Sequence, residues 1–343
     1  MTEVRVGVSG LGSIGRQHLT ALRAAGATTL YGFDAASATC EAALVAHPDL
    51  RLVDSFDALL DSRLDAVVVA VPDHAHLAQL EAAAKAGIAV LVEKPLAPSA
   101  AEAATVIDRL GPAGNHCLVG YVLRHNAACL RVAGLLADRA IGEPTSFQVL
   151  LGAYGTITVA ANRFATPAYG RLYGDYSHEW DYLSWWFGAI TAVTAVERTV
   201  DVVPHVETPN LVDALLETES GLIGALHIDY VDRRGLRQVS VIGTDGSLTA
   251  DLGGGTTEVR RTGVDGAQRF ADLAPAGVAL TRQAAHLLAV ARGDEEPRVT
   301  LADGLAALQV ADALRTSAPT RSWVTVDRHH HPGNRHQHGD VDR

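Results

Sequence analysis

The sequence predicts a doubly wound parallel α/β domain, followed by an α+β half with a mainly antiparallel sheet. The first domain is predicted because strand-length apolar runs alternate with helix-like segments up to about residue 122. These runs are continuous, as in VRVGV and AVVVAV, which indicates strands buried on both faces by helices. The second half is predicted because its strand candidates follow one another without intervening helices.

The elements of the first half follow a regular β–α order. The expected strands are residues 4–10, 28–34, 66–71, 89–93 and 117–120. The expected helices are residues 16–25, 37–46, 76–86 and 99–110. We therefore expect one domain over residues 1–122.

The second half begins with a helical stretch and then becomes rich in strands. The expected helices are residues 126–137, 176–187, 280–292 and 301–316, the second of which stops at Gly188. The expected strands are residues 146–154, 190–200, 210–217, 222–230, 238–242 and 247–251, with turn residues between the later ones. We expect a domain over residues 123–327 and a frayed His-rich tail over 328–343, which holds five of the fifteen histidines.

Composition excludes several functions. The chain has 343 residues and a formal net charge of −11, which argues against a nucleic-acid-binding face. No apolar run approaches the roughly 20 residues that span a bilayer, and the N-terminus lacks the features of a signal peptide, so we expect a cytoplasmic protein. The three cysteines lie far apart without CxxC spacing, so we expect neither disulfides nor a metal site.

The first chemical motif is Gly10-Leu11-Gly12-Ser13-Ile14-Gly15, placed between the first strand and the first helix. Gly10 permits the tight turn, Gly12 admits a pyrophosphate and Gly15 allows close helix–strand packing, with Ser13 and Ile14 opening the helix beside the phosphate. Asp34 ends the second strand, 24 residues after Gly10, where an acid binds the adenine ribose. Its carboxylate would repel a 2′-phosphate, so the motif favours NAD over NADP.

Two further segments follow the third and fourth long strands. These are Val71-Pro72-Asp73-His74-Ala75-His76 and Glu93-Lys94-Pro95, both at carboxyl ends of strands, where open α/β sheets bind ligands. With the glycine-rich loop, they make the chain resemble the glucose–fructose oxidoreductase, inositol dehydrogenase and rhizopine-catabolism (Gfo/Idh/MocA) family over roughly residues 3 to 326. Further matches are Gly120-Tyr121, Arg124 and the segment GDYSHEWDYLSWWFG.

This resemblance implies a Rossmann domain and a C-terminal domain built on an open, mostly antiparallel sheet. In the family, the outer face of that sheet commonly packs against a second subunit, which implies a homodimer or homotetramer. The resemblance places Pro72 and His76 near the nicotinamide and its ribose. It also implies that Glu93 supports the cofactor pocket and that Lys94 reaches the reacting oxygen of a small-molecule substrate.

Oxidation of a secondary alcohol needs a base for the hydroxyl proton and a group that stabilises the developing oxyanion. Lys94 provides a cation on a long stem for the oxyanion. His178 is the candidate base, and Asp175 and Asp181 share its stripe at helical spacing, so either carboxylate would orient the imidazole. Asp175 is also a candidate helix cap. Arg124, followed by His125, is a candidate for binding substrate hydroxyls, phosphate or carboxylate.

The segment around His178 departs from the inositol dehydrogenases that the chain resembles. They have Asp-x-x-x-His, whereas this chain has Gly174 at the Asp position and Asp175 one residue later. The run Asp175-Tyr176-Ser177-His178-Glu179 resembles the variant found in sugar-modifying members. The substrate class therefore includes sugars, amino sugars and cyclitols.

The sequence thus predicts an NAD(H)-dependent oxidoreductase that interconverts a secondary alcohol and a ketone. One alternative is a redox-neutral glycosidase or epimerase of the same fold that retains its NAD. Reductases of bile-pigment or amino-acid-derived substrates form a second alternative. A non-catalytic NAD-sensing regulator is a third, but it would need neither Lys94 nor His178.

Overall fold

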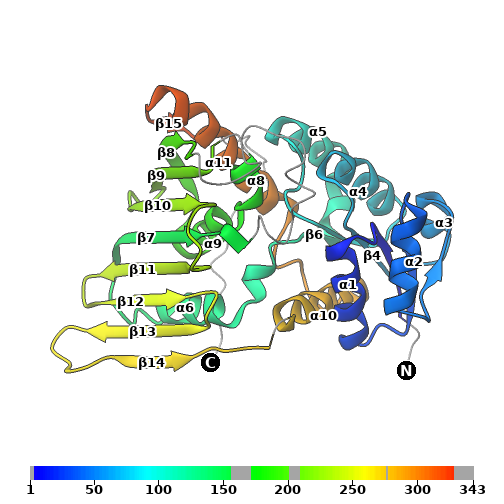
Figure 1. Ribbon diagram of the computed structural model, residues 1–343, viewed down its shortest axis with the longest axis horizontal. Coiled ribbons are helices and arrows are strands. Elements are labelled where there is room, and N and C mark those ends of the chain that lie inside the picture. Colours follow the sequence, from blue (N-terminus) through cyan, green and yellow to red (C-terminus); the bar gives the residue numbers. More distant parts are fainter. Residues whose placement is uncertain (1–3, 156–170, 201–208, 276, 328–343) are drawn as a thin grey trace.

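The computed structural model describes residues 4–155, 171–200, 209–275 and 277–327. Figure 1 shows two sheets side by side, one of nine strands at the left and one with helices around it at the right. The predicted tail, residues 328–343, lies outside the described residues. Among the described residues, none of the helices combines the length and apolar character that a membrane span requires.

The first sheet has six parallel strands in the order β3-β2-β1-β4-β5-β6, the order of a Rossmann domain. The strands are β1 (Arg5–Ser9), β2 (Thr29–Phe33), β3 (Arg51–Leu52), β4 (Ala66–Val69), β5 (Ala89–Val92) and β6 (Cys117–Val119). The helices are α1 (Ser13–Ala24), α2 (Ser37–Ala46), α3 (Phe56–Leu60), α4 (His76–Lys85) and α5 (Ala100–Leu110). The predicted doubly wound fold is confirmed.

Apolar clusters cover both faces of this sheet, which explains why its strands are continuously apolar. On one face, α1 packs with α10 (Val278–Arg292), a helix from the second half of the chain, in a cluster that includes Val8, Leu19 and Leu287. On the other face, α4 and α5 join the large core that continues into the second domain. The order of β1 and β4 places a topological switch point between them, and cofactors of such sheets bind there.

The second sheet has nine strands in the order β14-β13-β12-β11-β7-β10-β9-β8-β15, antiparallel except for the parallel pair β7 and β10. The strands are β7 (Pro144–Gly152), β8 (Ile190–Arg198), β9 (Leu211–Thr218), β10 (Ile223–Asp229), β11 (Arg237–Gly243), β12 (Gly246–Asp251), β13 (Thr256–Arg261), β14 (Gln268–Ala271) and β15 (Val324–Thr325). The prediction of a mostly antiparallel sheet is confirmed.

Helices cover one face of this sheet, between it and the Rossmann domain (Figure 1). They are α6 (Ala127–Ala137), α8 (Arg171–Asp175), α9 (His178–Phe187) and α11 (Leu301–Thr320). A short 3₁₀ helix, η3 (Val122–His125), connects β6 to α6. The core therefore runs from the sheet through α9 and α11 to the Rossmann domain.

Two local details differ from the prediction. The helix expected over residues 176–187 begins at His178, so Asp175 belongs to the preceding short helix α8 and not to the helix of His178. The strands β13 and β14, with the short strands β3 and β15, are also absent from the prediction. β13 and β14 lie at the polar edge of the sheet, where charged and exposed residues weaken the alternating pattern.

Candidate active site

The glycine-rich loop is shaped by close contacts that no side chain would tolerate. Gly10 has a φ of +87°, and a Cβ atom there would lie 2.4 Å from the carbonyl oxygen of Ala70, just after β4. A Cβ on Gly15 would lie 1.8 Å from the carbonyl oxygen of Gly10. The loop is therefore pressed against the end of β4 at the switch point, as the motif predicts.

Gly12 differs from Gly10 and Gly15, because a Cβ at Gly12 would meet nothing within 4 Å. Gly12 precedes α1 without a side-chain cap, so first-turn N–H groups beside Ser13 and Ile14 lack a capping side chain. Open space in front of an uncapped helix N-terminus fits the pyrophosphate of a dinucleotide. These observations show that the loop fits NAD.

Asp34 lies just past the end of β2 with its carboxylate held by two backbone N–H groups. The N–H of Leu11 donates to Oδ2 at 2.8 Å, and the N–H of Ala36 donates to Oδ1 at 2.9 Å. The side chain is thus fixed directly beside the glycine-rich loop. The motif predicts that Asp34 contacts the adenine ribose at this place. Its lone pairs have room for further donors.

The two ligand-binding segments lie at the ends of neighbouring strands, since β4 pairs with β5 through Val69 and Val92. Pro72 follows β4, and His76 begins α4 with its ring buried between the two segments. Glu93 and Lys94 follow β5. The structure therefore brings the predicted cofactor residues together at the carboxyl end of the sheet.

Lys94 extends from the Rossmann domain to the second domain. Its Nζ donates to the carbonyl oxygen of Asp175 at 2.8 Å. The carboxylate of Asp175 accepts a hydrogen bond of 2.9 Å from the hydroxyl of Tyr230, just after β10. Tyr230 was not predicted as a site residue, although its place after a strand that ends near the domain junction is a usable signal.

His178 begins α9 and is almost completely buried. Its ring meets that of Tyr121 edge-on, with centroids 5.5 Å apart. Burial, followed by the charges of Lys94 and Arg237, lowers the pKa of His178 well below its ordinary value. The ring is therefore neutral at pH 7, which is the form that accepts a proton.

The expected carboxylate partner of His178 is absent from the contacts of the described residues. Nδ1 of His178 is buried and has no hydrogen-bond partner among the described residues. Asp175 instead accepts from Tyr230, because the break between α8 and α9 separates it from the stripe of His178. Asp181 instead binds Arg124. Spacing alone therefore misassigned the partner.

Arg124 lies in η3 with its guanidinium buried between two carboxylates. Its Nη2 lies 2.8 Å from Asp181 and 3.1 Å from Asp303, and its Nε also contacts Asp181. Burial lowers the pKa of Arg124, but the two carboxylates outweigh it and raise that pKa. Burial raises the pKa of Asp181 to about 6 despite this arginine. Contact of Arg124 with substrate stays a prediction.

The residue that follows His178 belongs to a second ion pair. Glu179 is fully buried, and its Oε1 lies 2.9 Å from Nε of Arg237 on β11. This pair connects α9, one residue after the candidate base, to the sheet. Neither residue was predicted as functional, since a charge pair that joins a helix to a distant strand leaves no local signal in the sequence.

The lowered pKa of His125, at the domain junction, makes the stability of the protein depend on pH. His125 is buried, and burial, followed by Arg298, His286, Arg124 and Arg282, lowers its pKa to about 3. In the unfolded chain this histidine takes a proton near pH 6.5, whereas in the folded chain it does not, so stability falls as pH drops from about 6.5 towards 3.

We expect the variant His125→Phe to lose less stability on acidification than the wild type. Between pH 6.5 and 4.5 the difference should reach up to about 2 kcal/mol in the free energy of unfolding. Urea unfolding at both pH values measures it, and other titrating groups cancel in the comparison. Equal losses in the two proteins would show that His125 is protonated in the folded state.

The first part of the chain matches a family model. Residues 4–121 match the model described as "Oxidoreductase family, NAD-binding Rossmann fold", and residues 129–249 match the GFO/IDH/MocA C-terminal domain. The chain belongs to the Gfo/Idh/MocA family. It is therefore an NAD-dependent oxidoreductase, and the predicted family and cofactor are confirmed.

Curated relatives of this family member align over nearly the whole chain. Inositol 2-dehydrogenase 1 of Saccharopolyspora erythraea is 30% identical over 335 residues, 94% of this chain and 96% of the relative. Inositol 2-dehydrogenase 2 of Paenarthrobacter aurescens is 28% identical over 346 residues, 94% of this chain and 98% of the relative.

Solved structures share the fold at lower identity. A levoglucosan dehydrogenase in complex with NADH and levoglucosan has a TM-score of 0.81 at 20% identity, covering 95% of this chain and 100% of the other. A myo-inositol dehydrogenase from Corynebacterium glutamicum has a TM-score of 0.78 at 19% identity, covering 96% of this chain and 100% of the other.

Proposed function

We propose that this oxidoreductase interconverts a secondary alcohol and a ketone on a sugar, amino sugar or cyclitol. The observation that carries the proposal is the meeting of Lys94, Asp175 and the neutral His178 at the carboxyl end of the Rossmann sheet. The inositol 2-dehydrogenases and the levoglucosan dehydrogenase among its relatives support a polyhydroxylated substrate.

In the proposed mechanism, bound NAD⁺ supplies the hydride acceptor. His178 takes the hydroxyl proton, because burial and the nearby cations keep its ring unprotonated at neutral pH. Lys94 stabilises the negative charge that develops on the substrate oxygen, from a position fixed by its hydrogen bond to the carbonyl of Asp175. The hydroxyl of Tyr230 donates to the carboxylate of Asp175 and orients it. In this mechanism the carboxylate binds a neighbouring hydroxyl of the substrate.

The absence of an aspartate at position 174 affects which polyol the site can bind. A Cβ at this position would lie 3.9 Å from Cγ of Pro95, in ordinary contact with the residue after Lys94. An aspartate there, as in the Asp-x-x-x-His pattern, would start beside that segment, whereas Asp175 points towards Tyr230. We therefore propose a substrate class that is wider than myo-inositol.

A substrate panel tests the proposed reaction. Absorbance at 340 nm is followed for the purified protein with NAD⁺ and inositols, aldoses, amino sugars or anhydro sugars, and products are identified by mass spectrometry. We expect NADH and a ketone from at least one polyol. Conversion of a glycoside or an epimer without net NADH, by protein that retains its cofactor, would favour the redox-neutral alternative instead.

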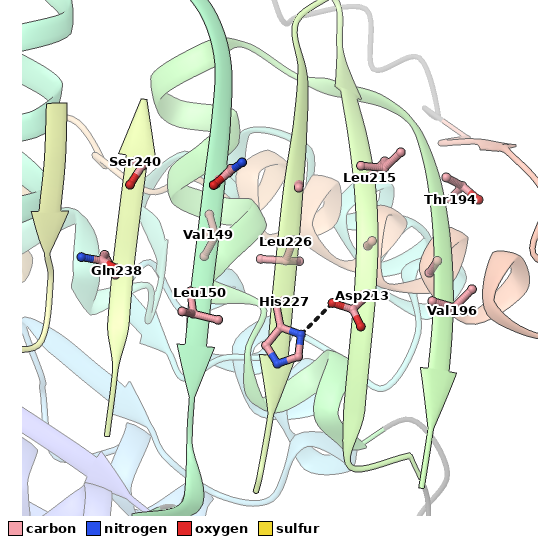
Figure 2. A pocket seen from close by; sticks show the side chains of 14 residues that line it. Val149, Leu150, Thr194, Val196, Asp213, Leu215, Leu226, His227, Gln238 and Ser240 are labelled. Atoms are coloured by element: carbon pink, nitrogen blue, oxygen red, sulfur yellow. Dashed lines mark hydrogen bonds and ion pairs between the residues drawn. The ribbon is translucent and has the colours of Figure 1, made fainter. Parts of the chain in front are cut away.

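We also propose that the outer face of the nine-stranded sheet binds a second copy of the chain. Figure 2 shows this face, with side chains towards the viewer and helices behind the sheet. A hollow of about 530 Å³ lies over its central strands. Four aliphatic side chains are exposed on this face, one from each of β8 to β11: Val196, Leu215, Ile223 and Ile242.

The charged groups at the centre of this face are already paired within the chain. The ring nitrogens of His227 lie 2.6 Å from Asp213 and 3.0 Å from Asp229. Burial lowers the pKa of His227, but the two carboxylates outweigh burial and raise it. A face that combines exposed aliphatic side chains with internally paired charges is suited to burial against a copy of itself.

Substitution Leu215→Lys tests this association. Because the new ammonium would be buried opposite the second copy, we expect the variant to run as one chain, whereas the wild type runs as two or four. Light scattering coupled to gel filtration measures the mass. The control is Val45→Lys, on an exposed aliphatic residue of α2, which should keep the wild-type mass. A wild type of single-chain mass would contradict the proposal.

A further inference from the structure

Two buried histidines that take no part in the proposed mechanism contact the residues on either side of Lys94. His18 lies on α1, directly behind the glycine-rich loop, and His76 begins α4. Both rings are almost completely shielded from solvent. Each comes from a different helix, so the segment Glu93-Lys94-Pro95 is held from two directions.

His18 holds the residue before Lys94. Its Nε2 lies 2.7 Å from Oε1 of Glu93, while Oε2 of Glu93 accepts the backbone N–H of Lys94 at 3.2 Å. Burial would raise the pKa of Glu93, but the hydrogen bond and charge of His18, with Lys94, hold it below its ordinary value. The carboxylate is therefore ionised, and its geometry is set by a group from the cofactor helix.

The space around Glu93 leaves little freedom for another arrangement. A Cβ on Gly120, just after β6, would lie 3.1 Å from both Cα and Oε2 of Glu93. The carboxylate is thus packed against bare backbone on one side and against His18 on the other. A change at His18 is therefore expected to shift Glu93 and the peptide that follows it.

His76 holds the residue after Lys94. Its Nδ1 lies 2.8 Å from the carbonyl oxygen of Pro95, and its Nε2 lies 2.8 Å from the carbonyl oxygen of Val71. Each ring nitrogen thus faces a carbonyl oxygen within hydrogen-bond distance, and an N–H on either nitrogen donates to the carbonyl that it faces. The ring therefore connects the segment after β5 to the segment after β4, the two segments that border the predicted nicotinamide site.

We propose that His18 and His76 are positioning residues that fix the peptide carrying Lys94, and so direct its ammonium group towards the reacting oxygen. The inference rests on the proposed function, in which Lys94 stabilises that oxygen. Because His18 stands on the helix of the glycine-rich loop, it also ties the position of Lys94 to the cofactor-binding end of the domain. Purely structural histidines would affect stability and leave Lys94 unchanged.

The lysine content of the chain allows a direct test. Lys85 and Lys94 are its only lysines, so protein labelled with ¹³C at lysine Cε gives two side-chain signals, assigned with Lys85→Arg. The test compares His18→Leu, which removes the donor, with His18→Gln, which keeps an N–H near the position of Nε2. The control is His286→Leu, which removes another buried histidine with a glutamate partner, on α10.

We expect His18→Leu to move the Lys94 signal and to reduce kcat by about 10- to 100-fold, as for a catalytic group displaced by a fraction of an ångström. His18→Gln should restore the signal and bring kcat to within about threefold of the wild type. His76→Leu should act like His18→Leu, while His286→Leu should leave the Lys94 signal in place.

An unchanged Lys94 signal and kcat in His18→Leu, even with a lower melting temperature, would overturn the proposal. Equal disturbance by His18→Gln and His18→Leu would overturn it too, since the hydrogen bond would then be irrelevant. If His18→Leu does not fold, His18→Asn, whose amide is too short to reach Glu93, replaces it. The signal is read without substrate or cofactor, so it decides the position of Lys94 even when no alcohol yields NADH.

Discussion

Lys94→Ala is expected to lower kcat by about 100- to 1000-fold, the usual cost of removing one group that stabilises an oxyanion. The structure predicts a smaller effect on NAD⁺ binding. The Lys94 ammonium donates to the carbonyl of Asp175, across the domain junction and away from the glycine-rich loop. The dissociation constant for NAD⁺, measured by titration calorimetry, should therefore stay within about threefold of the wild type.

Lys85 provides the matched control for this substitution. It is the other lysine of the chain, exposed on α4, and it pairs with Glu81 one helical turn away. Lys85→Ala should keep the wild-type kcat, because a surface pair of this kind contributes about 0.3–0.5 kcal/mol at most. A Lys94→Ala enzyme with near-normal turnover would remove Lys94 from the proposed mechanism.

Arg124→Met is expected to lower the free energy of unfolding by about 3–5 kcal/mol, because it leaves the buried carboxylate of Asp181 without its partner. Asp181 is almost completely shielded from solvent and receives contacts from both Nε and Nη2 of the arginine. The second partner, Asp303, also caps α11, so the loss extends to the junction between the domains. Urea unfolding followed by circular dichroism measures the change.

Two comparisons separate the buried charge from the loss of an arginine side chain. Arg131→Met removes a half-exposed arginine that lies 3.1 Å from the shielded carboxylate of Asp272. It should cost less than Arg124→Met, because this carboxylate keeps the hydroxyl of Thr257 as a hydrogen-bond donor. Adding Asp181→Asn to Arg124→Met should recover part of the lost stability, since the carboxylate of Asp181 is then no longer left buried without its partner. A loss in Arg124→Met no larger than in Arg131→Met would show that Asp181 is not charged in the folded protein.

The Rossmann domain follows from local features of the sequence. Its long strands appear within one or two residues of their predicted ranges because strands buried on both faces are continuously apolar. The glycine-rich loop is also predictable from sequence, since the steric demands at Gly10 and Gly15 admit no side chain. The segment with Lys94 lies where its position after a strand places it.

Features that depend on distant contacts could not be predicted. The apolar spacing of residues 176–187 continues a helix, yet α9 begins only at His178, and the carbonyl of Asp175 accepts a hydrogen bond from Lys94, 81 residues away. Helical spacing put Asp181 beside His178, but its partner Arg124 comes from the domain junction. Such pairings are set by tertiary packing, which spacing along one element does not contain.

Isotope transfer shows directly whether NAD⁺ takes a hydride from a carbon of the substrate. The protein is incubated with NAD⁺ and a polyol deuterated on carbon, with perdeuterated myo-inositol and perdeuterated glucose as the first two, and the reduced cofactor is analysed by mass spectrometry. We expect NADH that carries one deuterium, formed together with a ketone, and loss of this product in Lys94→Ala. Substrate conversion that leaves no deuterium in the reduced cofactor would contradict direct oxidation of a substrate carbon by NAD⁺.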